Sequence, residues 1–232
     1  MTDLNQRIGH LAQRLLEAKY VVVFTGAGIS TDSGLRDFRG PDGLWTRRDK
    51  GLPTPEQNWT GVEPNSGHVA IFELQELGKL AFLISQNVDN LHLKSGIRPE
   101  ILAELHGNLT KVRCVNCEFK MDRMEDERTC PLCGGKLKST VVNFGDSLPA
   151  KDLEESYEHS QRCDLFIVVG SSLVVYPAAE MPRVALEAGA KLVIINQGET
   201  PYDAHARLRF SERIGEVMPP AVERLKRLMK AS

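Results

Sequence analysis

The hydrophobic residues of the chain follow two alternating spacings. Leu4, Ile8, Leu11 and Leu15 recur three or four positions apart, which predicts an amphipathic helix over 4–18. The β-branched run at 20–24 is typical of a strand buried on both faces. Further strand-like runs lie at 80–85, 140–143, 165–169 and 192–195, and helical patterns lie at 69–77, 152–159, 177–188 and 222–229. Strands that alternate with helices predict an α/β fold with a doubly wound parallel sheet.

Residues 112–139 interrupt this alternation with two cysteine pairs and a charged stretch at 122–128. A segment of that size cannot bury a core of its own, so we expect a metal to supply its folding energy. We therefore divide the chain into an α/β domain, residues 1–111 and 140–232, and an inserted module, residues 112–139. The long loop at 40–66 is rich in Gly, Pro and polar residues, and we expect it to contribute to the small domain and to function.

Four of the five cysteines form two Cys-x-x-Cys pairs with twelve residues between them, namely Cys114, Cys117, Cys130 and Cys133. This spacing predicts a tetrahedral zinc site that resembles a zinc ribbon. The alternatives are two redox pairs or coincidence. A site in which cysteines fill all four positions has no room for a reacting water, so we expect one structural zinc per chain. Cys163 stands apart before an apolar run and is expected to be a small core residue.

Composition and charge narrow the class of protein. Hydrophobic residues make up 41% and charged residues 26% of the 232 positions, which excludes a disordered or fibrous chain. Twenty-nine basic against 31 acidic side chains give a net charge of −2, so bulk charge favours neither nucleic acid nor a membrane surface as partner. The apolar runs are too short to span a bilayer, and no secretory signal is visible at 1–7. We expect a soluble, intracellular protein located in the cytoplasm, or in the nucleus if the source is eukaryotic.

Glycines break the chain directly after the first strand-like run. Gly26 and Gly28 stand where a strand-to-helix turn would let a diphosphate approach backbone N–H groups. The signal is weak alone, because Thr31 occupies the position of the third glycine of the usual dinucleotide fingerprint, and a plain structural turn is the alternative. The charged segment 32–41, with Phe38 as its aromatic residue, is typical of a lid over a bound nucleotide.

Two further clusters carry candidate chemistry. Amides and an acid, including Asn87 and Asp89, follow the strand at 80–85, where open α/β sheets bind ligands, although a capping loop would use the same residue types. His106 precedes a glycine on the loop that enters the cysteine module, and it could act as a general base near neutral pH. A lone histidine is more often structural, so this interpretation needs the other motifs.

Taken together, the motifs resemble those of sirtuins, the NAD-dependent protein-lysine deacylases, from about residue 20 to residue 218. The motifs occur in the sirtuin order, at 26–30, 37–40, 86–89, 105–107, the four cysteines, 144–146, 170–173 and 192–196. The stretches 39–46 and 146–149 look most like class IV. The resemblance implies a Rossmann-like fold with a small inserted zinc module, and an enzyme that uses NAD as co-substrate and acylated-lysine proteins as partners.

The resemblance also implies site residues. The catalytic residues would be His106, Asn87 and Asp89. The NAD-binding residues would be Gly26, Ala27, Gly28, Thr31, Phe38, Arg39, Trp45, Gln86, Asn87, Asp89, Gly170, Ser171, Ser172, Asn196 and Ile214. The substrate peptide would add as a strand between two segments, with contacts from Asn143, Phe144, Gly145, Asp146, Leu173, Val174 and Val175.

In the implied reaction, the acyl oxygen attacks the NAD ribose and expels nicotinamide, and His106 then removes a ribose hydroxyl proton. Water finally releases free lysine and O-acyl-ADP-ribose. Asp89 would hold the nicotinamide amide, and Phe38 would shield the reacting centre from water.

The chain departs from the sirtuin pattern at several positions. Arg36 replaces a usual Pro, Asn90 a usual Gly, Asn143 an aromatic residue or Val, and Asp146 a usual Glu. No Tyr-x-x-Arg occurs within 46–68, so neutral acyl groups are expected rather than succinyl or malonyl groups. A protein mono-ADP-ribosyltransferase and a non-catalytic NAD-sensing zinc module are the alternative functions. The oligomeric state stays open.

Overall fold

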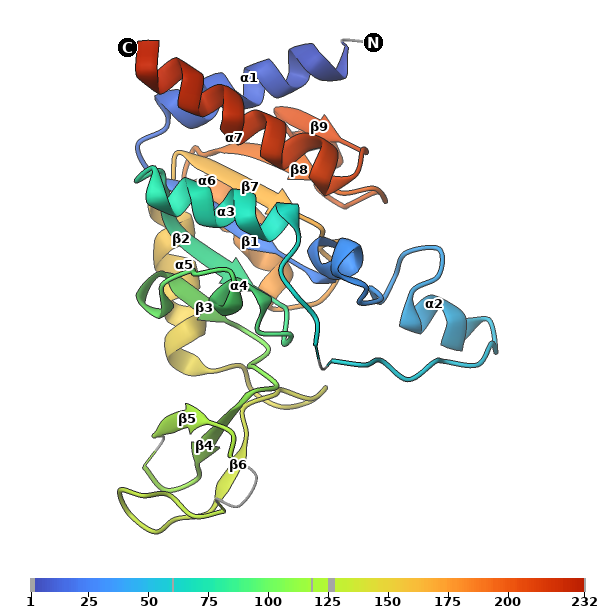
Figure 1. Cartoon of the computed structure of the whole chain (residues 1–232), viewed down its shortest axis with the longest axis vertical. Coiled ribbons are helices and arrows are strands. Elements are labelled where there is room, and N and C mark those ends of the chain that lie inside the picture. The colour runs from blue at the N-terminus through green and yellow to red at the C-terminus, as the bar shows by residue number, and fades with distance from the viewer. Residues whose placement is uncertain (1–2, 60, 118, 125–127, 232) are drawn as a thin grey trace.

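The computed structural model describes residues 3–59, 61–117, 119–124 and 128–231, so Met1, Thr2 and the acidic centre of the 122–128 stretch lie outside the described residues. Its main body is a six-stranded sheet in the order β3-β2-β1-β7-β8-β9, and every neighbouring pair is parallel. The strands are β1 Val21–Thr25, β2 Leu80–Ser85, β3 Leu102–Glu104, β7 Leu165–Val169, β8 Lys191–Ile195 and β9 Leu208–Phe210. This order confirms the predicted doubly wound sheet (Figure 1).

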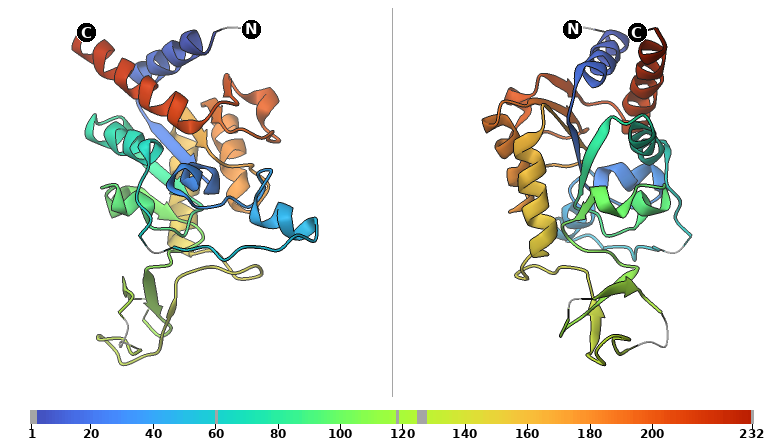
Figure 2. Two further views of the ribbon diagram at one scale, coloured as in Figure 1. Left: turned by 45° about the vertical axis from the view of Figure 1, so that its right-hand side comes forward. Right: turned by 90° about the vertical axis from the view of Figure 1, so that its left-hand side faces the viewer.

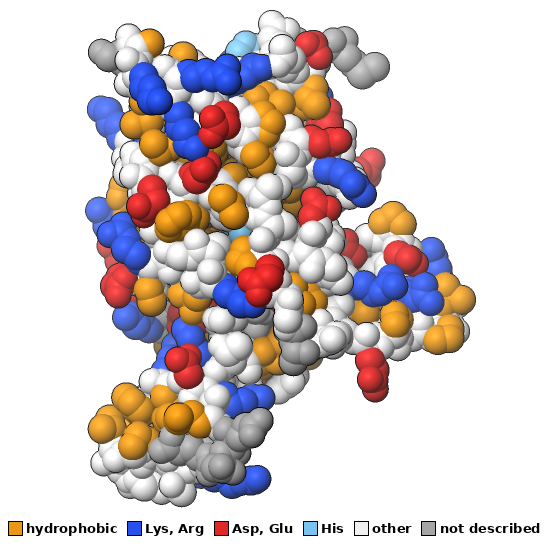
Figure 3. Space-filling model, viewed as in Figure 1, with side chains coloured by type: hydrophobic (Ala, Val, Ile, Leu, Met, Phe, Trp, Pro, Cys, Tyr) orange, Lys and Arg blue, Asp and Glu red, His pale blue; other side chains and the backbone are white. Residues whose placement is uncertain are grey.

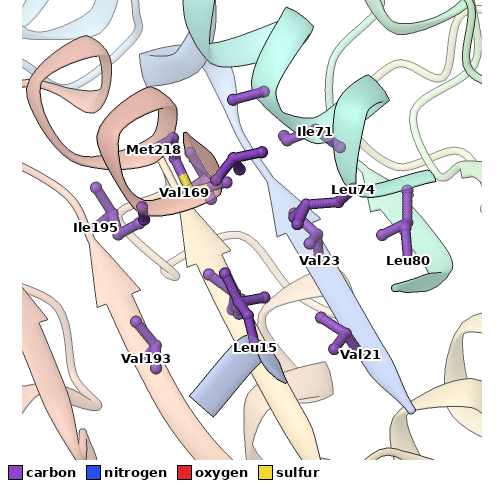
Figure 4. Packing of buried hydrophobic residues seen from close by; sticks show 14 of the residues in the cluster. Leu15, Val21, Val23, Ile71, Leu74, Leu80, Val169, Val193, Ile195 and Met218 are labelled. Atoms are coloured by element: carbon purple, nitrogen blue, oxygen red, sulfur yellow. The ribbon is translucent and has the colours of Figure 1, made fainter. Parts of the chain in front are cut away.

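Helices cover both faces of the sheet. Helices α1 Leu4–Glu17, α3 Ser66–Glu76 and α7 Ile214–Ala231 pack on one face, and α5 Ala150–Arg162 and α6 Met181–Glu187 pack on the other (Figure 2). Side chains alternate across a strand, so Val21 and Val23 belong to the first face and Val22 and Phe24 to the second. Figure 4 shows the first core, where Leu15, Leu74 and Met218 close over the strands. Cys163 is buried in the second core, as predicted.

A separate antiparallel sheet of three strands in the order β5-β4-β6 lies at the lower end of Figure 1. Its strands are β4 Lys111–Cys114, β5 Lys120–Asp122 and β6 Leu137–Ser139. Among the described residues, ion pairs between Lys111 and Glu104 and between Lys120 and Asp152 connect it to the main body. The division of the chain into two domains stays a prediction.

Short elements complete the chain. They are α2 Leu44–Asp49, α4 Leu91–Lys94 and the 3-10 turns η1 Ala27–Ser33, η2 Pro99–Ile101, η3 Ala178–Glu180 and η4 Asp203–His205. Among the described residues, no helix combines the length and apolar character needed to cross a bilayer. On the face in Figure 3, acidic and basic side chains are intermixed, in keeping with the near-neutral net charge.

The structure corrects several predicted elements. The predicted strand at 140–143 is wrong, because this segment runs beside the His106 loop, where Val142 N–H donates to the His106 carbonyl, and joins neither sheet. The predicted helix at 177–188 is divided into η3 and α6, and the loop at 40–66 contains α2. Helix α7 begins at Ile214, well before the predicted start at residue 222, although Pro219 and Pro220 lie within it.

Candidate active site

The strands of the main sheet all end at one edge, and the predicted site residues follow those ends. The strand order reverses between β1 and β7, where open α/β sheets form their ligand crevice. The residues that follow the strands are, in sheet order, His106 after β3, Gln86, Asn87 and Asp89 after β2, Gly26, Ala27 and Gly28 after β1, Gly170, Ser171 and Ser172 after β7, Asn196 after β8 and Ile214 after β9.

Glycines let the turns after β1 and β7 cross in direct contact. Gly28 N–H donates to the Gly170 carbonyl at 2.8 Å, and a Cβ on Gly28 would lie only 2.8 Å from Gly170 Cα. Gly170 itself has a φ of +67°, a conformation that other residues rarely adopt. At the missing third glycine, Thr31 donates its hydroxyl proton to the Gly28 carbonyl at 2.9 Å and holds the turn.

A half-buried carboxylate, that of Asp89, lies next to this turn. Ser30 Oγ donates to Asp89 Oδ2 at 2.6 Å, and Leu91 N–H donates to Asp89 Oδ1 at 2.9 Å. Asn87 Nδ2 donates to the same Ser30 oxygen at 3.2 Å. Burial raises the pKa of Asp89, and the two hydrogen bonds oppose that rise. Ser30 therefore joins Asn87 and Asp89 into one polar cluster.

His106 lies on the neighbouring loop with its ring orientation fixed. Its Nδ1 is 2.9 Å from the Gln86 carbonyl, and a carbonyl can only accept, so Nδ1 carries the proton and Nε2 keeps the lone pair. Burial lowers the pKa of His106, so the imidazole stays neutral at pH values where an exposed histidine would begin to take up a proton. Gln86 also donates through Nε2 to Ser171 Oγ at 2.8 Å and so connects the ends of β2 and β7.

Aromatic side chains connect the predicted lid to the predicted peptide segment. Trp45 of α2 contacts Phe38, with ring centroids 4.8 Å apart, and Phe144, with centroids 5.4 Å apart. The Arg39 guanidinium lies over the Trp45 ring at 4.8 Å, a favourable cation–π distance. Phe144 is 81% exposed, so this aromatic row ends at the protein surface.

The two predicted peptide-binding segments each contain a residue with a left-handed backbone. Asn143 and Asp146 form a closed turn, in which Asn143 N–H and Nδ2 both donate to the Asp146 carboxylate. Gly145 within this turn has a φ of +91°. On the other segment, Leu173 is buried with a φ of +55°, whereas Val174 is 42% exposed.

The four cysteine sulfurs converge in the small sheet. All four Sγ atoms lie within 4.8 Å of one another, and three Sγ–Sγ distances are 3.4, 3.5 and 3.6 Å. A tetrahedral zinc with Zn–S bonds of about 2.3 Å sets sulfurs about 3.8 Å apart, so the donors fit this ion. Gly135 makes room, because a Cβ there would lie 2.8 Å from Cys114 Sγ.

Comparison with known proteins assigns the family. The pattern of the Sir2 family matches residues 53–177. The chain is 39% identical to an NAD-dependent protein deacylase of Thermococcus kodakarensis, over 96% of this chain and 97% of that protein. The chain belongs to the Sir2 family.

Other relatives of this sirtuin differ in length. The NAD-dependent protein deacylase 2 of Archaeoglobus fulgidus is 41% identical, over 97% of this chain and 98% of that protein. The NAD-dependent protein deacetylase SRT1 of Oryza sativa is 42% identical, but the chain spans only 47% of its length. The chain thus corresponds to about half of the plant relative.

Solved structures agree with the fold of this sirtuin. A structure described as the structural basis for the mechanism and regulation of Sir2 enzymes has a TM-score of 0.79 at 39% identity, over 96% of this chain and 99% of that one. A Sir2 bound to acetylated peptide has a TM-score of 0.72 at 34% identity, over 97% and 98%. A Sir2 homologue mutant in complex with ADP-ribose has a TM-score of 0.81 at 34% identity, over 96% and 98%.

The predicted residues of this sirtuin fall into two groups. Asn87 and Asp89 share Ser30 as a partner, and His106 is held by Gln86. Asn196 and Ile214 lie farther along the same edge, and Asn196 donates to the Gly198 carbonyl at 2.8 Å.

Ser30 is a site residue that the sequence did not single out, although it ends the glycine motif at 26–30. The spacing could not show that Ser30 lies beside a carboxylate 59 positions later. In contrast, His92, three residues after Asp89, is buried and pairs outside this polar cluster, since its Nε2 lies 2.9 Å from Thr25 Oγ1.

Proposed function

We propose that this sirtuin is an NAD-dependent protein-lysine deacylase that releases nicotinamide, O-acyl-ADP-ribose and free lysine. The observation that carries the proposal is the His106 imidazole, which is held through Nδ1 by the Gln86 carbonyl on the loop that carries the half-buried Asp89 carboxylate. The names of the relatives, deacetylases and deacylases that depend on NAD, support the same reaction.

The residues at the edge of the main sheet fit NAD. The crossing of Gly28 and Gly170 lies where the strand order reverses, and at this point the two turns meet backbone to backbone. We assign the diphosphate to the turns after β1 and β7, including Ser172, and the adenosine to Asn196 and Ile214. When bound, NAD supplies a ribose carbon that accepts the acyl oxygen of the substrate as nicotinamide leaves.

Asp89 and Asn87 would orient the nicotinamide end. The Asp89 carboxylate accepts one hydrogen bond on each oxygen, and each oxygen keeps a further lone pair for a carboxamide N–H. Holding the leaving group in a fixed orientation lowers the entropic part of the barrier. Phe38 and Trp45 would exclude water from this end of the site.

His106 would accept a proton at Nε2. Because Nδ1 is committed to the Gln86 carbonyl, Nε2 is the basic atom, and it can take the proton of a ribose hydroxyl. The lowered pKa keeps this atom unprotonated at neutral pH.

The structure favours neutral acyl groups. Arg36 and Arg47 are the cations that could attract an acyl carboxylate, and both pair with Asp42, at 3.3 and 3.0 Å. Arg47 also donates through Nε to the Pro53 carbonyl. Asp42 offsets one of the two positive charges, so the two arginines attract a negatively charged acyl chain less than two unpaired cations would.

The acylated peptide would pair through its main chain with the segment at 173–175, in which Val174 is exposed. The other wall would be Phe144 and Gly145, while pairing at Asn143 requires its turn with Asp146 to open. Main-chain pairing recognises an extended peptide without demanding one flanking sequence.

The zinc would be structural. We also propose that the chain is most similar to class IV sirtuins and that it divides into two domains. Four sulfur donors complete a tetrahedral shell, so no position is left for a reacting water. The long loop containing α2 would belong to the small domain, because Trp45 contacts Phe144, which follows β6 of the small sheet along the chain.

A panel of acyl-lysine peptides incubated with NAD, with products identified by mass spectrometry, tests the function. We expect nicotinamide release only with acylated peptide, together with O-acyl-ADP-ribose. Nicotinamide release with transfer of ADP-ribose to protein would instead support the transferase. Binding of NAD without any nicotinamide release would support a non-catalytic sensor.

A further inference from the structure

A row of hydrogen bonds extends the pairing of β2 and β3 beyond the ends of these strands. Leu105 N–H donates to the Ser85 carbonyl at 2.9 Å, and the next residue, His106, donates through Nδ1 to the Gln86 carbonyl at 2.9 Å. Leu109 N–H then donates to the Val88 carbonyl at 2.8 Å. The loop of Asp89 and the loop of His106 are therefore connected at successive points.

The last connection in this row is made by two side chains. Asn108 Nδ2 donates to Asn90 Oδ1 at 2.8 Å. Asn90 directly follows Asp89, and Asn108 lies two residues after His106. This contact thus joins a residue beside Asp89 to a residue near His106, the two side chains that act in the proposed reaction.

The Asn108 side chain is held in one orientation, so it can fix the residue that it contacts. It is 1% exposed, and Nδ2 also donates to Glu104 Oε1 at 2.5 Å. Its Oδ1 accepts from Thr110 N–H and Thr110 Oγ1, at 2.9 and 2.8 Å. Both amide protons and both lone pairs are used, so the amide cannot rotate without losing hydrogen bonds.

Asn90 is suited to this contact by its backbone as well as its side chain. Its φ is +67°, in the left-handed region that glycine and asparagine tolerate best. A glycine there would keep the backbone but would have no oxygen for Asn108. Asparagine satisfies both requirements.

We propose that Asn90, through its bond to Asn108, is a positioning residue that fixes the Asp89 loop relative to the His106 loop. The inference rests on the proposed deacylase function. Asp89 would act when nicotinamide leaves and His106 in the later step. Loosening the contact should therefore affect lysine release, which needs both loops in register, more than nicotinamide exchange, which needs the Asp89 loop alone.

The test compares Asn90→Gly with the wild-type chain. Loss of one neutral hydrogen bond should lower kcat/KM for lysine release about 3- to 10-fold, and nicotinamide exchange should fall less. Asn90→Asp tolerates the same backbone and keeps an acceptor for Asn108, so it should restore the ratio of the two rates. Ser95→Ala is the matched control, because it removes one bond, from Ser95 Oγ to the His92 carbonyl at 2.8 Å, at the other end of α4.

The outcomes separate the inference from the function. Lysine release by the wild-type chain supports the function whatever the variants do. A selective loss in Asn90→Gly that Asn90→Asp restores and Ser95→Ala lacks supports the positioning role. Unchanged rates in Asn90→Gly, an equal loss of both rates, or no recovery in Asn90→Asp would each overturn it.

Discussion

Replacing Ser30 by alanine tests the polar cluster at the proposed nicotinamide end. Ser30 is 1% exposed, and its hydroxyl donates to Asp89 Oδ2 at 2.6 Å, a short bond of the kind that charged acceptors form. The Ser30→Ala variant removes that donor and leaves Leu91 N–H as the remaining partner of the carboxylate. It also deprives Asn87 Nδ2 of its acceptor.

The expected effect follows from the charge on the acceptor. A hydrogen bond to a charged group contributes about 1.5–3 kcal/mol, which corresponds to roughly 10- to 150-fold in rate if the bond holds Asp89 in the transition state. The pKa of Asp89, already raised by burial, should rise further without the donor. Because the ionised carboxylate is the active form, the acid limb of the rate should move to higher pH.

Nicotinamide exchange, measured with labelled nicotinamide across a pH series, reports this step directly. Ser33→Ala is the matched control, since Ser33 lies in the same turn and its oxygen accepts from Asn65 Nδ2 at 3.0 Å, away from Asp89. The control should stay near the wild-type rate. If Ser30→Ala exchanged nicotinamide within about twofold of wild type at every pH, the role of the Ser30–Asp89 bond would be refuted.

Four further outcomes are expected. His106→Ala should lower the rate of lysine release ~10²–10⁴-fold and the rate of nicotinamide exchange less, and near-wild-type lysine release would contradict the assignment. Because burial lowers the pKa of His106, kcat/KM of the wild type should fall only below pH 6.5. Asp89→Asn should raise Tm at neutral pH and raise it less in acid. A carboxyl whose pKa is raised in the folded state destabilises the fold once pH rises through that pKa, and Asn cannot ionise. A Tm difference between variant and wild type that is the same in acid and at neutral pH would speak against this. Asp42→Asn should improve turnover of succinyl-lysine peptide relative to acetyl-lysine peptide, and a higher wild-type kcat/KM for succinyl than for every neutral acyl group would disprove the selectivity. Metal analysis should find about one zinc per chain, and Cys114→Ser should give insoluble protein, whereas active, folded protein without zinc would rule the structural site out.

The continuous apolar strands and the long amphipathic helices made most of the fold predictable. Strands β1, β2, β7 and β8 are continuous apolar runs that are buried on both faces, so their composition alone marks them. The three-residue strands β3 and β9 carry no such signal, because only part of each is buried and their pairing depends on the neighbouring strand. The segment 140–143 has the composition of a strand but lies against a loop.

The candidate site was predictable where a motif is local and unpredictable where contacts cross the chain. The glycine turn, the four cysteines and the order of the polar clusters could be recognised from residue types and spacing. The partners Ser30 and Asp89, or Asn90 and Asn108, are distant in sequence, and only the folded sheet brings their side chains together. The left-handed backbone of Asn90 is one that glycine adopts readily, which gives a physical reason for the Gly that the sirtuin pattern leads one to expect there.

Helices α1 and α7 lie side by side at the end of the molecule opposite the three-stranded sheet (Figures 1 and 2). Arg224 of α7 donates to the Asn5 carbonyl of α1 at 2.6 Å. The helix that begins at Leu4 and the helix that ends at Ala231 therefore belong to one layer. A linker, an affinity tag or an anchoring surface attached to either helix would therefore keep its distance from the small sheet. Immobilising the chain through α1 or α7 should leave the aromatic row at Phe144 open to solution.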